Sequence, residues 1–414
     1  MQSKFLAIAA LCLLSLYVTP AHSIYCWVNT NNDISDRQPL VLQTNSNEFL
    51  YPSKANSKDL KLNFCETLRV ACPQDNLVVF SRNLNVSEAT LRCYGLSFFD
   101  VVGTNYAAPF KRIGCTRMPV AEANSTGAIC PNGTIAHIGF TLSSSVFVPT
   151  IDQICFNDTL GQTHWAHSKV MLAVRKKQKE SVGVPTYQAG TFYPNITMSP
   201  SLFSRDSERA RLMTLLNDSS LVDMYIPLTG DNYLVEGMLV PRSDMFYRAQ
   251  QDSTYFYINT VPMWKSVRDN NWKLVEDIVR KTAGKQSANF DVWTGGYQVL
   301  SFDNGTGNAT EITLTTNRDG SSTVPVPKFL FKYVVDQVRN RGVVFVTLNN
   351  PHIGTITSSE MICQARSECT NLYPQFNVAT MGYTYCCAID SSSGFYNIAS
   401  SLGLPTFPSA QPLI

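Results

Sequence analysis

The stretch that decides the fold of this 414-residue chain spans residues 231–284 and reads DNYLVEGMLVPRSDMFYRAQQDSTYFYINTVPMWKSVRDNNWKLVEDIVRKTAG. Two runs rich in aromatic and β-branched residues, 232–240 and 253–261, predict strands. A helix is predicted over residues 272–282, with Gly284 closing its last turn. The stretch therefore predicts a compact strand–strand–helix unit.

Three motifs in this unit carry a resemblance to a known family. They are EGMLVP at residues 236–241, NTVPM at 259–263 and RDNNWKLVEDIVR at 268–280. They resemble motifs of secreted insect DNA/RNA non-specific endonucleases, where the first reads Arg-Gly-His-Leu-x-Pro and the second Asn-x-x-Pro-Gln. The resemblance covers residues 155–395. It implies an α+β fold, a ββα-metal endonuclease-like domain with a central antiparallel sheet and flanking helices.

The residues that hydrolyse a phosphodiester in that family are mostly replaced here. Hydrolysis needs a base that activates water and positive charge that stabilises the pentavalent phosphate. The resemblance implies a histidine base and one Mg²⁺ held by an asparagine. This chain places Met238, which has no titratable proton, at the base position and Glu236 at the position of the family's arginine. Arg268, which cannot ligate Mg²⁺, stands at the metal-ligand position.

Two of the family's site residues survive one helical turn apart, Glu276 and Arg280. The resemblance implies that the glutamate orients metal-bound waters and that the arginine contacts phosphate. Without a metal, we expect Glu276 to pair with Arg280 or Arg268. No catalytic residue, metal ligand or cofactor is assigned; Mg²⁺, with Glu276 in its outer shell, is expected only if the family's activity survives.

Basic and aromatic residues surround the altered site. Arg268 is expected to take the place of the missing cation and to grip phosphate through its guanidinium fork. Interleaved aromatic residues predict either base stacking or an ordinary strand–helix core. The aromatic residues are Tyr247, Tyr255, Tyr257, Trp264 and Trp272. The predicted nucleic-acid contacts are Arg242, Lys265, Arg268, Lys273 and Arg280.

The chain divides into three predicted parts. Residues 1–23 have a basic start, a short apolar run and a small-x-small cleavage site, and predict a signal peptide. Residues 24–160 predict a small cysteine-rich β domain, and residues 161–414 the endonuclease-like domain, with a helix over 204–216. Secretion favours disulfides over zinc. The predicted disulfide cysteines are Cys26, Cys65, Cys72, Cys93, Cys115, Cys130, Cys155, Cys363, Cys369, Cys386 and Cys387.

Eight sequons predict glycosylation of a secreted chain. They begin at Asn85, Asn124, Asn132, Asn157, Asn195, Asn217, Asn304 and Asn308.

The formal net charge is only +2, so any electropositive face must be local. Our leading hypothesis is a secreted protein that binds DNA and RNA without sequence preference and cuts them weakly or not at all. It resembles the degenerate tsetse salivary branch of the family, which implies release into saliva and no membrane partner. Two alternatives stay open. One is a metal-dependent endonuclease in which another histidine, such as His164, reaches the site; the other is a salivary protein that binds a host protein or small ligand through its N-terminal domain.

Overall fold

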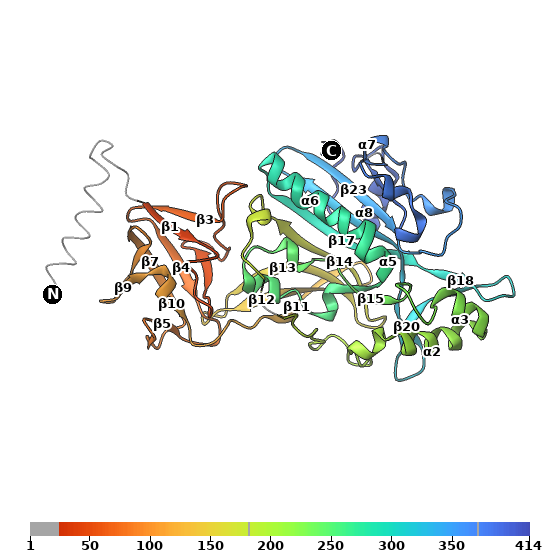
Figure 1. The fold of residues 1–414 in the computed structure, drawn as a ribbon, viewed down its shortest axis with the longest axis horizontal. Helices are drawn as coiled ribbons and strands as arrows, with labels where there is room; N and C mark the ends of the chain where they lie inside the picture. Colours follow the sequence, from red (N-terminus) through yellow and green to blue (C-terminus); the bar gives the residue numbers. More distant parts are fainter. Residues whose placement is uncertain (1–24, 181–182, 371) are drawn as a thin grey trace.

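The computed structural model describes residues 25–180, 183–370 and 372–414. The predicted signal peptide lies outside the described residues. Figure 1 shows a group of N-terminal strands, red to orange, at one end of the molecule and helices α2 and α3 at the other. None of the helices in the described ranges is long and apolar enough to cross a membrane.

The N-terminal strands form a five-stranded sheet in the order β2-β4-β7-β8-β9, a three-stranded sheet β10-β5-β6 and a ribbon β1-β3. Buried and exposed side chains alternate along short strands such as β3. Because successive side chains point to opposite faces of a sheet, one face is packed against the core. The strands are β1 (Tyr25–Asn29), β2 (Leu40–Gln43), β3 (Asp59–Asn63), β4 (Thr67–Ala71), β5 (Leu77–Val79), β6 (Arg82–Asn83), β7 (Glu88–Gly95), β8 (Phe98–Val101), β9 (Ala107–Pro109) and β10 (Ile113–Cys115).

A nine-stranded sheet forms the larger part of the molecule. Its order is β11-β12-β13-β14-β17-β22-β23-β24, all antiparallel, and β25 adds in parallel to β23. The predicted central antiparallel sheet is confirmed. The sheet continues through residue 160, where the sequence predicts a domain boundary, because β13 hydrogen-bonds to β14 across a short turn. Its strands are β11 (Glu122–Cys130), β12 (Gly133–Thr141), β13 (Phe147–Asn157), β14 (Gln162–Val170), β17 (Phe290–Val299), β22 (Pro327–Asp336), β23 (Arg341–Leu348), β24 (Thr384–Cys387) and β25 (Gln411–Pro412).

Helices cover both faces of this sheet. On β22, Val334 belongs to the core that contains Val275 and Val279 of α6, whereas Tyr333 on the opposite face stacks on Phe395 of α8. This two-residue alternation is what a strand buried on both faces requires. The helices are α2 (Arg205–Leu216), α3 (Ser219–Tyr225), α4 (Arg248–Asp252), α5 (Lys265–Val267), α6 (Lys273–Gln286), α7 (Ser367–Thr370) and α8 (Gly394–Ser401).

Three two-stranded ribbons complete the strands of the described part. They are β15 (Leu234–Met238) with β16 (Thr260–Trp264), β18 (Ser301–Asp303) with β19 (Ala309–Glu311), and β20 (Thr313–Thr316) with β21 (Ser322–Pro325).

Two sequence predictions about the strand–strand–helix unit need correction. The strand predicted over 253–261 begins only at Thr260, because Tyr257–Asn259 form a 3-10 turn. Gly284 does not close α6, which continues to Gln286 and ends at Ser287 with φ of 49°. By contrast, the helix predicted over 204–216 is confirmed, as the Ser204 side chain accepts a hydrogen bond from Ser207 N.

Five disulfides are described, and none of the described cysteines is a free thiol. Two staple the N-terminal strands, one joins β11 to β13, and two hold the C-terminal segment. The pairs are Cys26–Cys93, Cys72–Cys115, Cys130–Cys155, Cys363–Cys387 and Cys369–Cys386.

A buried amide fixes the β15–β16 ribbon to the large sheet. Trp264 N donates to Asn349 Oδ1 at 3.1 Å. Asn349 Nδ2 donates to the carbonyl oxygens of Pro262 and Pro327, at 3.1 and 2.9 Å. Since Asn349 is fully buried, water cannot replace these bonds.

We therefore expect Asn349→Ala to lower the free energy of unfolding by about 2–4 kcal/mol, because it leaves buried backbone groups without partners. Urea denaturation measures the loss, with the exposed Asn45→Ala as control. A loss no larger than that of Asn45→Ala would contradict the role of this amide.

Candidate functional site

The family motifs lie on the β15–β16 ribbon and the helix that follows it. Glu236 is paired with Pro262 and Met238 with Thr260 across the two strands. Between them, a Cβ at Gly237 would lie 2.2 Å from Met263 Cγ, so any larger residue would displace the buried Met263 side chain. The glycine of the motif is thus required by packing.

Asn259 has a structural role in the second motif. Its Oδ1 accepts from Val240 N at 3.0 Å, and its Nδ2 donates to the carbonyl oxygens of Val240 and Thr254, each at 2.9 Å. The side chain is fully buried. These bonds clamp the segment that connects the two strands.

An irregular turn, Arg268–Trp272, leads from the ribbon into α6. It is a π-helical turn with Asn270 at φ −112° and ψ −105°, and such turns are common at functional sites. Asn271 Nδ2 anchors the turn by donating to the carbonyl oxygens of Gln375 and Gly382, both at 2.7 Å. Buried Trp272 fills the space beneath the turn. The turn that carries Arg268 is therefore anchored by the buried side chains of Asn271 and Trp272.

Ribbon, turn and helix enclose a cleft of about 630 Å³. It brings together Glu236, Met238, Arg268, Lys273, Glu276 and Arg280, all singled out in the sequence. Arg242 and Lys265 do not line it. Tyr187, Asp269 and Asp277 also line it.

No imidazole reaches this cleft from the described part of the chain. The Met238 sulfur instead accepts a weak hydrogen bond from the Thr254 hydroxyl at 3.9 Å. His164, the alternative base, is half-buried on β14, and burial lowers the pKa of its imidazole. His167, on the same strand, is held between two carboxylates. Its ring nitrogens lie 2.9 Å from Asp152 Oδ2 and 3.1 Å from Asp291 Oδ1.

The residues at the metal position do not fit Mg²⁺. The guanidinium of Arg268 carries its own positive charge there, and its Nε donates to Asp269 Oδ1 at 2.8 Å. No group of three or more histidine, cysteine, aspartate or glutamate side chains within the described ranges is arranged to hold a metal ion. Burial raises the pKa of Glu276 to about 7, although the charges of Lys332 and Arg280 act to lower it.

A buried ion cluster lies under the cleft. Arg280 Nη1 donates to Asp244 Oδ1 and Arg280 Nη2 to Asp277 Oδ1, both at 2.6 Å. Lys332 Nζ lies 3.7 Å from Asp244 Oδ2, and burial lowers the pKa of its ammonium group. The expected pairing of Glu276 with Arg280 is present at 4.0 Å. These contacts direct Arg280 into the wall of the cleft.

Sequence reasoning missed two members of this cluster. Asp244 lies in a segment that has no motif, and Lys332 lies on β22. The only signal was a single lysine inside the apolar run FLFKYVV, since a charge in a buried strand requires a partner.

The other basic residues predicted to contact nucleic acid differ in whether carboxylates already pair with them. Lys265 Nζ lies 3.1 Å from Asp231 and 2.9 Å from Asp269, and Arg242 lies near Glu180 and Asp252 at 3.5 and 3.8 Å. Lys273 is exposed and forms no ion pair with any described residue. The cleft is lined by as many carboxyl groups as basic side chains. The basic residues are Lys177, Arg268, Lys273 and Arg280, and the acidic residues are Glu236, Asp269, Glu276 and Asp277.

The aromatic residues around the site belong to the core. All five are at most 5% exposed, so their rings have no free face for a nucleobase. The core interpretation is correct, and the stacking interpretation fails at these positions. The residues are Tyr247, Tyr255, Tyr257, Trp264 and Trp272.

The pKa of Glu276 makes the stability of the protein depend on pH. A folded-state pKa of about 7, against an ordinary value of 4.5, means that the folded state holds this proton more tightly than the unfolded state. The free energy of unfolding therefore falls as pH rises from about 4.5 to about 7. We expect Glu276→Gln to remove this loss, so that the variant gains about 2–3 kcal/mol over the native protein across that window.

Urea denaturation between pH 4.5 and 8 measures this effect. Glu311→Gln, at an exposed edge strand, is the control and should follow the native curve. Parallel curves for Glu276→Gln and the native protein would show that the carboxyl is not buried in its protonated form.

Comparison with known proteins agrees with this geometry. The family model described as DNA/RNA non-specific endonuclease matches residues 131–392. Salivary protein Tsal1 of Glossina morsitans morsitans is 30% identical over 302 residues, 72% of each chain. Salivary protein Tsal2A of the same fly is 25% identical over 376 residues, covering 88% of this chain and 89% of that protein. A salivary endonuclease of Lutzomyia longipalpis is 25% identical over 364 residues, covering 87% and 80%. The chain belongs to the DNA/RNA non-specific endonuclease family.

Proposed function

We propose that this protein is a secreted nucleic-acid-binding member of its family that binds DNA and RNA without sequence preference and hydrolyses them weakly or not at all. One observation carries the proposal. Met238, which stands where the family resemblance implies the general base, lines a cleft that no described histidine lines. A thioether does not accept a proton from water in the physiological range, so a bound phosphodiester meets no activated nucleophile.

Two side chains of the cleft are available to bind phosphate. Arg268 uses only Nε in its bond to Asp269, and its two terminal amino groups form no hydrogen bond with the described residues. Lys273 stands exposed at the start of α6. A guanidinium in the place of a metal ion retains positive charge against phosphate but supplies neither a bound hydroxide nor a Lewis acid.

Secretion into saliva and glycosylation are part of the proposal. The three relatives named above are salivary proteins, and the described disulfides suit an oxidising compartment. Each of the eight sequon asparagines is at least partly exposed, as attachment of a glycan requires.

A second candidate function is slow, metal-independent cleavage with Glu276 as the base. The observation that favours it is the raised pKa of Glu276, about 7, on a carboxyl that lines the cleft. Such a group is poised to accept a proton from water near neutral pH. Any cleavage by this route should persist in EDTA and disappear in Glu276→Gln.

A nuclease assay tests whether the protein lacks the metal-dependent hydrolysis of its family. Plasmid DNA and double-stranded RNA are incubated with the protein and Mg²⁺ or Mn²⁺, with EDTA controls. The native protein should show no metal-dependent turnover. Met238→His together with Arg268→Asn should introduce it, by roughly 100-fold over the native rate, because the base and metal ligand return. Met238→Leu with Arg268→Asn is the matched control and should stay inactive. Robust metal-dependent cleavage by the native protein would overturn the proposal.

Gel shifts or fluorescence anisotropy over a salt series test binding. Affinity for DNA and RNA should fall steeply with salt and should not change with EDTA, since no metal takes part. Arg268→Ala with Lys273→Ala should lower the slope of log affinity against log salt by about 2, one for each phosphate contact. Lys281→Ala with Lys285→Ala, at exposed positions further along α6, is the control. Absence of any binding at low salt would refute the proposal.

A further inference from the structure

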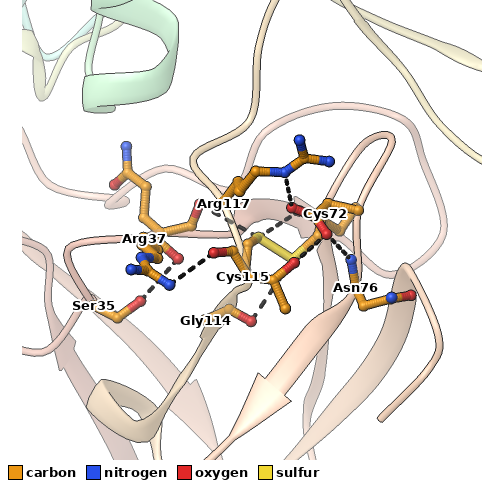
Figure 2. Close-up of a disulfide and its surroundings, with 11 residues drawn as sticks. Ser35, Arg37, Cys72, Asn76, Gly114, Cys115 and Arg117 are labelled. Atoms are coloured by element: carbon orange, nitrogen blue, oxygen red, sulfur yellow. Dashed lines mark hydrogen bonds and ion pairs between the residues drawn. A yellow bond between two sulfur atoms is a disulfide. The ribbon is translucent and has the colours of Figure 1, made fainter. Parts of the chain in front are cut away.

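A second cleft, of about 610 Å³, lies in the N-terminal unit. Three parts of the chain line it: the turn at residues 35–37, the β5–β6 hairpin and the segment from Lys111 to Thr116. It lies beside the disulfide Cys72–Cys115, and Figure 2 shows Ser35, Arg37 and Gly114 around that bond. Nothing in the family motifs involves this region.

The charge of this cleft is not balanced. Arg37, Lys111 and Arg112 line it, against the single carboxylate of Asp36. All three basic side chains are exposed, and none forms an ion pair with a described residue. Arg37 Nη1 donates to the carbonyl oxygen of Thr116 at 2.8 Å, which holds the side chain and leaves its positive charge in place. The endonuclease-like cleft, by contrast, has as many carboxylates as basic side chains.

An aromatic ring stands at the rim in an unusual backbone conformation. Phe80 and Ser81 form the tip of the β5–β6 hairpin with φ of 50° and 66°, and Phe80 is 57% exposed. Such a turn favours asparagine or glycine, and a bulky residue there is a genuine outlier. The Phe80 side chain therefore does not stabilise the turn. Backbone strain of this kind is typical of ligand clamps.

The surrounding backbone holds these groups in fixed positions. Phe80 N donates to the carbonyl oxygen of Arg112 at 3.0 Å, which ties the ring to the basic segment. On the other side, Cys115 N donates to the carbonyl oxygen of Arg37 at 2.8 Å. A Cβ at Gly114 would lie 2.6 Å from Ser35 Oγ, so the turn packs directly on the β10 backbone. The cleft is preformed, and binding a ligand there requires little ordering.

We propose that this cleft binds single-stranded DNA or RNA, with Arg37, Lys111 and Arg112 on the phosphates and Phe80 stacked on a base. A free aromatic ring next to unpaired cations is the combination that recognises an unstacked base and its backbone. Of the two aromatic residues that line the endonuclease-like cleft, Tyr255 is 5% exposed and Tyr187 is half-buried, so neither presents a ring as open to solvent as that of Phe80. The inference rests on the proposed nucleic-acid-binding function and adds a second contact to it.

Fluorescence anisotropy of the full-length protein with a labelled 20-nucleotide oligothymidylate tests the role of the ring. Phe80→Asn retains a residue that suits the positive φ, so the hairpin should fold, and affinity should fall roughly five- to a hundredfold. Leu96→Asn is the matched control, because Leu96 is 86% exposed and has φ of 51° in the neighbouring β7–β8 turn, away from the cleft. It should bind like the native protein.

The charges are tested in the same assay. Lys111→Ala with Arg112→Ala should lower the salt slope by about 2, whereas the exposed Lys54→Ala with Lys58→Ala should leave it unchanged. If both the Phe80→Asn variant and the Lys111→Ala, Arg112→Ala double variant lose affinity, the proposal that this cleft binds single-stranded nucleic acid is supported.

If both of these variants bind the oligonucleotide as tightly as the native protein, the N-terminal cleft is not a binding site. If the Arg268→Ala, Lys273→Ala double variant nevertheless loses affinity, the proposed nucleic-acid-binding function still holds. If no native binding occurs at all, the proposed function itself fails. If the cleft variants lose affinity for heparin but retain it for the oligonucleotide, the site binds sulfated polysaccharide and the inference is wrong.

Discussion

The pairing of Asp244 with Arg280 and Lys332 holds the functional site together, because it is where three separate segments meet. Asp244 follows the first ribbon strand, Arg280 comes from α6, and Lys332 comes from β22 of the large sheet. The side chains of Asp244 and Lys332 are both 1% exposed. A charge buried this deeply is tolerated only with its partners, so removing Asp244 would leave two buried cations without the carboxylate that they share. The ribbon, helix and sheet are thus kept in one relative position.

The residues of the motifs divide into those that hold the fold together and those that line the cleft. Gly237, Asn259 and Asn271 each have a packing or hydrogen-bonding role in the fold. Met238 and Arg268 lie at the wall of the cleft, where a change of side chain alters reactivity without opening the core. Folding therefore constrains the first group of positions much more strongly than the second.

The endonuclease-like cleft and the N-terminal cleft differ in how many of their basic side chains are paired with carboxylates. Most basic residues near the endonuclease-like cleft are paired with carboxylates. Arg268 is bonded to Asp269 through Nε alone, and Lys273 forms no ion pair with a described residue. The N-terminal cleft has more uncompensated positive charge and an exposed ring at its rim. The net charge of the chain is only +2, but a polyanion in contact with a cleft interacts mainly with the charges of that cleft. Salt screens the more distant charges of the surface.

The sequence by itself determined the order strand, strand, helix in residues 231–284, the helix that begins after Ser204 and the presence of Met238 in the first motif, because each depends on local patterns or on the identity of one residue. Only the tertiary structure decided which cations are free, where α6 ends and that the large sheet runs through residue 160. The reason is that ion pairs and sheet hydrogen bonds join residues far apart in the chain. Lys332 finds Asp244, and Phe80 meets Arg112, through contacts that no local pattern contains.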